Sequence, residues 1–164
     1  MKTDQPRIKE LDTREVACVS FVGDFVGKQE IFSDLFNKLC GWAGTKGLIS
    51  ETSVFLVSYE NCSKTTPPEE FKLDICMSIP QDIEAEGEIQ RKSLPGGQYA
   101  VQHCELAGPK EYETVWNKLE DWADKNNFEM DMSRPSYEIY LNNSDEHPEK
   151  QQILDICLSV KLKG

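Results

Sequence analysis

Histidine and basic side chains are scarce in this sequence of 164 residues. It contains two histidines, and its 18 lysines and arginines are outnumbered by 29 aspartates and glutamates, which gives a net charge of −11. A protein that binds nucleic acid needs a basic face to contact the phosphates. The charge balance therefore argues against direct nucleic-acid binding, and the shortage of histidine disfavours a Ser–His–Asp triad.

Long apolar runs are absent as well. No segment approaches the roughly 18 apolar residues that a membrane-spanning helix needs. Residues 1–10 are polar and of mixed charge, and they lack the apolar centre of a signal peptide. We therefore expect a cytoplasmic protein without a membrane partner.

Motifs that mark cofactor, phosphate or metal sites are also missing. The sequence has no Gly-x-Gly-x-x-Gly, no Walker-type Gly-Lys-Ser/Thr and no Gly-x-Ser-x-Gly. Its six cysteines form no Cys-x-x-Cys pair, and their spacing does not distinguish a reactive thiol from a buried apolar one. We expect neither a cofactor nor a metal ion.

The sequence does contain an internal repeat. Residues 73–78 (LDICMS) recur 81 positions later as residues 154–159 (LDICLS), and the pair Trp42-Ala43 recurs 80 positions later as Trp122-Ala123. Several blocks in the same order at nearly one spacing indicate a duplicated unit. We place the repeats at 15–80 and 89–162, joined by an acidic linker at 81–88. A half of this size buries too little surface to be stable alone, so we predict one domain over residues 1–164.

Both halves predict the order strand–helix–strand–strand. Helical spacing and β-rich runs place helices and strands as follows in the first half: strand 15–25, helix 28–46, strand 54–59 and strand 73–79. The second half reads in the same way: extended segment 89–106 with a break at 95–97, helix 110–126, strand 137–142 and strand 153–162. We therefore predict an α+β fold in which two units related by a pseudo-two-fold axis form an antiparallel sheet covered by two helices.

Two sequence blocks and the helix between them resemble a known family. Residues 95–101 (PGGQYAV) and 134–143 (RPSYEIYLNN), together with the tryptophan-bearing second helix, are similar to the GyrI-like small-molecule-binding family. That family includes DNA gyrase inhibitor proteins and the effector-binding domains of multidrug-sensing transcription regulators. The resemblance covers residues 15–162. It implies a cleft between the two repeats that binds lipophilic, often cationic compounds, with Glu138 as the acidic residue on the central strand.

Strand alternation defines the surroundings of this glutamate. Glu138 and Tyr140 share one face of their strand, and Phe55, Val57 and Tyr59 share the equivalent face in the first repeat. The repeat therefore predicts Val57 opposite Glu138 and Tyr59 opposite Tyr140. A carboxylate among apolar and aromatic groups attracts a cation strongly, because little water screens its charge, and aromatic ring faces add to the attraction.

Several of these residues also have an ordinary structural interpretation. Tyr59 and Tyr140 could be cross-strand aromatic residues that stabilise a sheet. Trp116 lies on the apolar helix face and could belong to the core or to the wall of the site. Tyr99 could reach the cleft or anchor its strand. The repeated Asp74 and Asp155 favour a structural role, since catalysis is rarely symmetric.

Three functions remain open on the sequence alone. The first is a module that binds a small amphipathic or cationic ligand through Glu138, Tyr140, Tyr59, Phe55, Val57, Trp116 and Tyr99. The second is a hydrolase of small electrophilic natural products, in which Glu138 acts as general acid or base and Tyr140 or Tyr59 assists. The third is a protein-interaction role, such as inhibition of DNA gyrase, which depends on the family resemblance alone.

Overall fold

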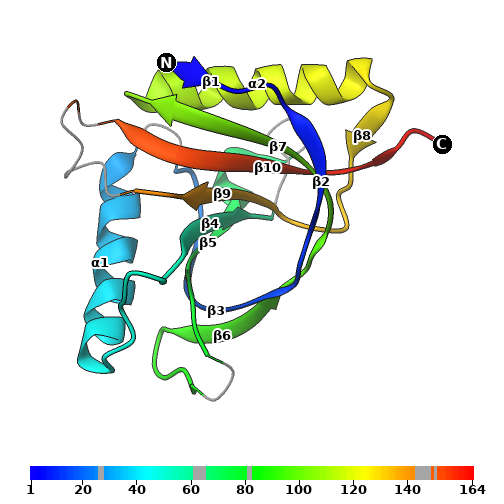
Figure 1. Cartoon of the computed structure of the whole chain (residues 1–164). Coiled ribbons are helices and arrows are strands. Elements are labelled where there is room, and N and C mark those ends of the chain that lie inside the picture. The colour runs from blue at the N-terminus through cyan, green and yellow to red at the C-terminus, as the bar shows by residue number, and fades with distance from the viewer. Residues whose placement is uncertain (26–27, 61–65, 81–82, 143–148, 150) are drawn as a thin grey trace. The chain divides into compact units, whose positions relative to one another are not determined.

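The computed structural model describes residues 1–25, 28–60, 66–80, 83–142, 149 and 151–164 (Figure 1). Its contacts divide the chain into two compact units. One comprises residues 13–95, and the other comprises residues 1–12 and 96–164.

The 13–95 unit is an antiparallel sheet with one helix. Its elements are β3 (Arg14–Val22), α1 (Gln29–Thr45), β4 (Phe55–Tyr59), the short 3₁₀ helix η1 (Pro68–Glu70), β5 (Lys72–Ser78) and β6 (Gln90–Leu94). The strand order is β6–β3–β5–β4. Helix α1 packs on β3 and β5 and buries Leu35, Leu39 and Ala43, which recur every four residues on one face.

The second unit has the same core plan with additional strands. Its elements are β1 (Lys2–Thr3), β2 (Arg7–Leu11), β7 (Gly97–Leu106), α2 (Pro109–Lys125), β8 (Phe128–Met130), β9 (Ser136–Tyr140) and β10 (Gln152–Leu162). β10 pairs with β7 along one edge and with β9 and β8 along the other, while β1 and β2 pair with β7. All of the pairings described here, in both units, are antiparallel, and together with the two helices they confirm the predicted α+β class.

The order strand–helix–strand–strand occurs in both units, as β3–α1–β4–β5 and as β7–α2–β9–β10. The segment 89–106 forms two strands that separate at the predicted break. Its first strand, β6, pairs with β3 in the 13–95 unit, and its second, β7, belongs to the other unit. The one-domain organisation, the repeat boundaries and the pseudo-two-fold axis stay predictions.

The core beneath α2 explains how this helix is held. Buried apolar residues from three elements form it: Ala100, Cys104 and Leu106 of β7, Leu154, Ile156, Leu158 and Val160 of β10, and Val115, Leu119 and Ala123 of α2. Trp122 packs at its margin, in agreement with a structural role for this repeated tryptophan. Tyr112, Trp116 and Tyr140 also pack against this core and lie beside the candidate site.

The two repeated aspartates have structural partners. Asp74 is buried and accepts hydrogen bonds from the Ser20 hydroxyl and from Lys92 Nζ, the latter at 2.8 Å. Asp155 Oδ1 lies 2.9 Å from His103 Nδ1 on the neighbouring strand. Each repeat thus uses this position to tie adjacent strands together, although the partner differs.

Candidate functional site

Glu138 lies in the middle of β9 and is 4% exposed. Its partner in the sheet register is Ile156 of β10, whose own partner on the far side is Gln102 of β7. Directly opposed residues in antiparallel strands point to the same face. Because Ile156 belongs to the core beneath α2, the Glu138 side chain points toward α2 as well.

Two aromatic side chains hold the buried carboxylate. Trp116 Nε1 donates a hydrogen bond to Oε2 of Glu138 at 2.7 Å, and the Tyr140 hydroxyl donates to Oε1 at 2.9 Å. Tyr140 is two residues further along β9 and therefore on the same face, whereas Trp116 comes from α2. Burying a carboxylate is costly unless it is paired, and hydrogen bonds to a charged acceptor are among the stronger ones. These two donors therefore stabilise a negative charge in an apolar setting.

The charge of Glu138 also acts on its neighbours. Burial raises the pKa of the Tyr112 hydroxyl well above its ordinary value, and the negative charge of Glu138 raises it further. Burial likewise raises the pKa of the Cys104 thiol to about 12, with smaller contributions from Asp155, Asp4 and Glu138. At neutral pH both groups are therefore protonated, and neither offers an anionic nucleophile.

Tyr112 is a member of this site that sequence reasoning did not single out. It precedes Trp116 by four residues on α2, which places both rings on one face of the helix. The four-residue spacing already indicates from the sequence that Tyr112 and Trp116 share a helix face. Nothing in the sequence, however, indicates which residues of that apolar face come near the glutamate.

Tyr99 lies on the other face of the sheet from Glu138. Its register partner is Ser159, and residues 159 and 156 of β10 point to opposite faces because the strand alternates. The Tyr99 ring is fully buried and stacks on Tyr137 at 5.3 Å between centroids. Its hydroxyl donates to the Pro135 carbonyl at 2.9 Å. Of the two sequence interpretations, these contacts match an anchor for its strand.

The site residues predicted from the first repeat lie on β4. Phe55, Val57 and Tyr59 pair with Met77, Ile75 and Leu73 of β5, respectively. Val57 is fully buried and the two aromatic residues are partly exposed. The Tyr59 ring lies 5.7 Å from Phe25, which also contacts Phe32 and Phe71. Their predicted position opposite Glu138 and Tyr140 stays a prediction.

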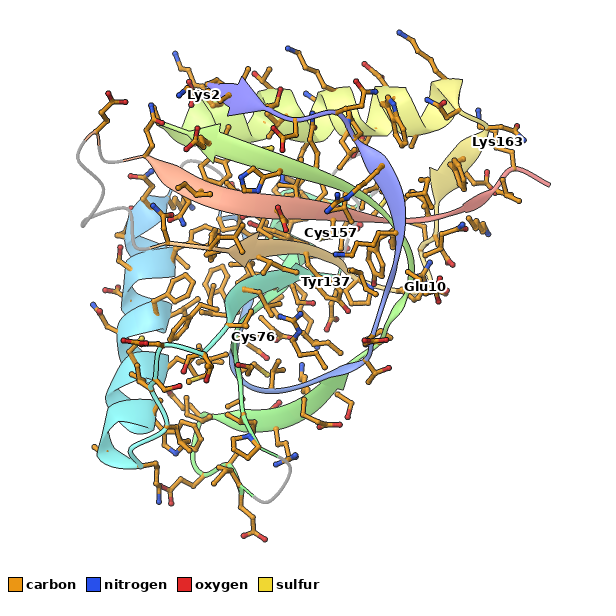
Figure 2. All side chains as sticks on the ribbon, viewed as in Figure 1. Lys2, Glu10, Cys76, Tyr137, Cys157 and Lys163 are labelled. Carbon is orange, nitrogen blue, oxygen red and sulfur yellow. The ribbon has the colours of Figure 1, made fainter. Side chains whose placement is uncertain are left out.

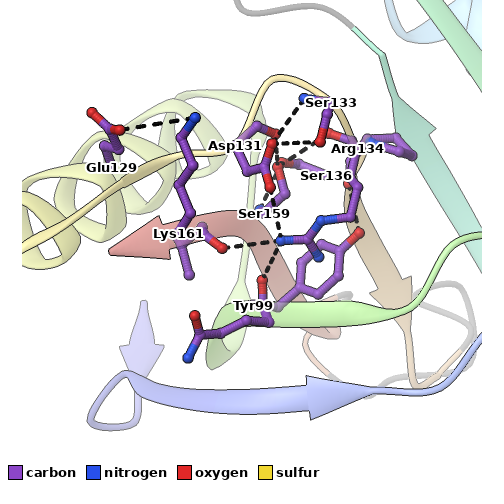
Figure 3. A network of polar contacts seen from close by, with 11 residues as sticks. Tyr99, Glu129, Asp131, Ser133, Arg134, Ser136, Ser159 and Lys161 are labelled. Atoms are coloured by element: carbon purple, nitrogen blue, oxygen red, sulfur yellow. Dashed lines mark hydrogen bonds and ion pairs between the residues drawn. The ribbon is translucent and has the colours of Figure 1, made fainter. Parts of the chain in front are cut away.

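The Arg134 side chain holds the segment that leads into β9 (Figure 3). Its Nη2 donates to the carbonyls of Gln98 and Val160, each at 3.0 Å, and forms an ion pair with Asp131 at 3.4 Å. The guanidinium carbon lies 4.8 Å from the centroid of the Tyr99 ring. Arg134 thus connects β7 and β10 to the start of β9, four residues before Glu138.

A known protein family matches nearly the whole chain. Residues 4–161 match the GyrI-like small molecule binding domain. This chain belongs to the GyrI-like family. The DNA gyrase inhibitor of Escherichia coli (strain K12) is 27% identical to it over 143 residues, which cover 85% of this chain and 87% of that protein.

Several solved structures share the fold of this GyrI-like chain. The C-terminal domain of EcmrR has a TM-score of 0.73 and 16% identity, with 96% of this chain and 98% of that domain covered. SAV2435 bound to tetraphenylphosphonium has a TM-score of 0.60 and 13% identity, covering 96% of this chain and 94% of that one. The chain spans 58% of the longer EcmrR chain in its complex with DNA, at a TM-score of 0.76 and 15% identity.

In the sequence blocks that pointed to the GyrI-like family, several residues outside the Glu138 site have a structural role. Gly97 begins β7 beneath the Arg134 guanidinium, and Tyr99 donates to Pro135. Ser159 N–H donates to Ser136 Oγ at 3.1 Å, and the Ser159 hydroxyl donates to the Arg134 carbonyl at 3.1 Å. These contacts fix where β9 begins, and strand alternation then directs Glu138 toward α2.

Neither a metal-binding cluster nor a membrane-spanning helix is found among the described residues. Within the described ranges, no group of three or more His, Cys, Asp or Glu side chains is arranged to hold a metal ion. None of the helices in the part of the chain that the structure describes is long and apolar enough to cross a membrane.

Acid should weaken the fold through Asp131. Hydrogen bonds from Ser133 hold the pKa of this carboxyl below its ordinary value of 3.8, and Arg134 contributes. A folded-state pKa below the unfolded one stabilises the fold above the unfolded pKa, and this contribution is lost as pH falls through the folded pKa. Urea unfolding between pH 3 and pH 7 should therefore show a shallower acid-side loss of stability for Asp131→Asn than for wild type. Parallel curves would contradict this assignment.

Proposed function

We propose that this GyrI-like small-molecule-binding domain binds a lipophilic cation, and that Glu138 supplies the countercharge. The observation that carries the proposal is a buried carboxylate held by two aromatic donors. A negative charge that is shielded from water attracts a positive ligand over several ångströms. The net charge of −11 also favours cationic over anionic ligands.

The hydrogen bonds of Glu138 also favour one kind of cation. Each carboxylate oxygen already accepts a hydrogen bond, from Trp116 or from Tyr140. A ligand therefore gains mainly from the field of the charge and from the ring faces, with about 0.5–2 kcal/mol from each cation–π contact. A delocalised or quaternary cation needs only these two contributions, whereas a primary ammonium also needs acceptors for three N–H groups, more than the roughly two remaining lone pairs of Glu138 supply.

We propose Glu138, Tyr140, Trp116 and Tyr112 as the ligand contacts of this unit. Contributions from Phe55, Val57 and Tyr59 stay predictions of the sequence repeat. Tyr99 is left out of the proposed contacts because its side chain points to the other face of the sheet. The structural neighbour SAV2435, which was solved bound to tetraphenylphosphonium, supports the choice of ligand class.

The test compares two ions of nearly one shape and opposite charge. Tetraphenylphosphonium and tetraphenylborate would each be titrated into the wild-type protein by calorimetry, with tryptophan fluorescence as a second readout. We expect saturable binding of the phosphonium at least roughly tenfold tighter than that of the borate, since only the cation gains from Glu138. Equal affinities, or no binding of the phosphonium, would overturn the proposal.

The hydrolase alternative has weaker support. A general base needs a carboxylate oxygen that can accept a proton from water or substrate. Both oxygens of Glu138 accept hydrogen bonds from aromatic side chains in the described structure, an arrangement that supports electrostatic attraction directly and adds no separate support for proton transfer.

An interaction with DNA gyrase is a second candidate. It is supported by the name of the Escherichia coli relative, which is 27% identical over 85% of this chain. A supercoiling assay with purified gyrase tests it independently of the ligand titrations. Unchanged supercoiling at high concentrations of this protein would remove this candidate.

A further inference from the structure

Two cysteines lie directly opposite each other in the 13–95 unit. Cys18 of β3 and Cys76 of β5 are register partners in the antiparallel ladder. Residues opposed in this way have Cα atoms about 4.5–5.5 Å apart, which lies within the range of about 4.4–6.8 Å found in disulfides. Both cysteines are fully buried, and neither is in a disulfide in the described structure.

The two thiols interact with each other. The Cys76 thiol donates its hydrogen to the Asp74 carbonyl at 3.5 Å. The neighbouring Cys76 side chain lowers the pKa of Cys18 against the opposing effects of burial and Asp74, with a smaller lowering from the Lys92 ammonium, whereas burial raises the pKa of Cys76. The pair is therefore asymmetric, and Cys18 is the better nucleophile of the two.

The internal repeat provides a control within the same chain. Cys157 occupies the position in LDICLS that Cys76 occupies in LDICMS (both are labelled in Figure 2), but its register partner on β7 is Val101. Cys104 lies opposite Leu154, and Cys40 is on helix α1. Among the cysteines that the structure describes, the pair Cys18–Cys76 alone has one thiol opposite another in a strand register. Cys62 lies outside the described residues.

We propose that Cys18 and Cys76 form a redox-sensitive pair, which a hydroperoxide converts into a disulfide within one chain. Cys18 loses its thiol proton and the thiolate attacks a peroxide oxygen, so the O–O bond breaks and Cys18 becomes a sulfenic acid, while the hydroxide that leaves takes up that proton and forms the first water. The Cys76 sulfur then attacks the Cys18 sulfur and loses its proton, the S–O bond breaks, and a second water leaves. Two thiols lose two electrons, and hydrogen peroxide is reduced to two waters.

This bond would join β3 to β5, the two inner strands of the order β6–β3–β5–β4. It closes a chain loop between residues 18 and 76 that contains α1 and β4. Cross-linking distant positions restricts the unfolded chain, so the oxidised protein should resist unfolding better than the reduced one. Because the two residues are already in register, the bond needs little movement of the backbone.

The experiment oxidises the native full-length protein and maps its thiols. Hydrogen peroxide would be added at levels that leave the circular dichroism spectrum unchanged, and remaining thiols would be blocked with N-ethylmaleimide during denaturation. We expect peptide mass spectrometry to find a linked Cys18–Cys76 peptide, a loss of two of the six thiols, and reversal by dithiothreitol. The urea midpoint of the oxidised protein should shift to a higher concentration.

Matched variants separate this pair from the other cysteines. Cys18→Ser should abolish the linked peptide, whereas Cys157→Ser should form it as wild type does. A peptide that links another pair, or linkage that forms only after denaturation, would overturn the proposal. If Cys18→Ser fails to fold, the test uses Cys76→Ala, which should also abolish the linked peptide, together with the peptide map of the wild-type protein.

Discussion

Replacing Glu138 by glutamine is expected to weaken the binding of tetraphenylphosphonium roughly 30- to 150-fold, or by about 2–3 kcal/mol. The estimate is the attraction between unit charges about 6 Å apart in a partly screened environment. Calorimetric titration of both proteins at the same ionic strength measures it. The effect should be specific to charge, so binding of tetraphenylborate should improve or stay unchanged in Glu138→Gln.

Glutamine is the appropriate replacement because it retains the shape and most of the hydrogen bonds of this site. Its amide oxygen can accept from Trp116 Nε1, and its amide nitrogen can donate to the Tyr140 hydroxyl, which accepts as well as donates. Alanine would instead remove the acceptor of both hydrogen bonds, which costs stability in its own right. A urea midpoint close to that of wild type would show that Glu138→Gln retains the fold.

Glu129→Gln provides the matched control. Glu129 lies on β8 in the same unit, and its side chain is 50% exposed beside Lys161. Water screens a charge at this position, so the substitution should leave phosphonium binding unchanged. Equal weakening by both variants would mean that overall acidity attracts the ligand, and full affinity in Glu138→Gln would remove this glutamate from the site.

The sequence predicted that Glu138 and Tyr140 share one face of their strand, because alternation within one strand needs only the position of that strand. It also placed Trp116 on the apolar face of its helix. It could not predict that the indole N–H reaches Glu138 Oε2, since the position of α2 over the sheet depends on packing among the core residues of three elements. Tyr112 was missed for the same reason.

Tyr99 shows a second limit of sequence reasoning. Whether it shares a face with Glu138 depends on two registers, β7 against β10 and β10 against β9. A shift of one residue in either register would place Tyr99 on the same face as Glu138.

The order of helices and strands in the two units was predictable because it repeats in the sequence. The division of residues 89–106 between two units was not, because it depends on the pairing of β6 with β3.

Replacing Gly97 by alanine is expected to lower the free energy of unfolding by about 3–5 kcal/mol. Gly97 has a φ of +137°, a conformation that residues with a side chain rarely adopt. An alanine Cβ would also lie 2.9 Å from Cζ of Arg134, closer than van der Waals contact allows. The guanidinium cannot yield at low cost, because Gln98, Val160 and Asp131 all accept from its Nη2. Urea unfolding of both proteins measures the loss.

Gly41→Ala is a control for which the opposite effect on stability is expected. Gly41 lies inside α1, and a methyl group added there would meet nothing within 4 Å outside its own stretch of helix, so alanine should stabilise the helix by about 0.5–1 kcal/mol.

A double-mutant cycle separates the two causes of the destabilisation by Gly97→Ala, which are backbone strain and the contact with Arg134. In an Arg134→Ala background only the backbone strain remains, so the cost of Gly97→Ala should fall to about 1–2 kcal/mol. An undiminished cost in that background would mean that the Arg134 contact is not what requires glycine at this position.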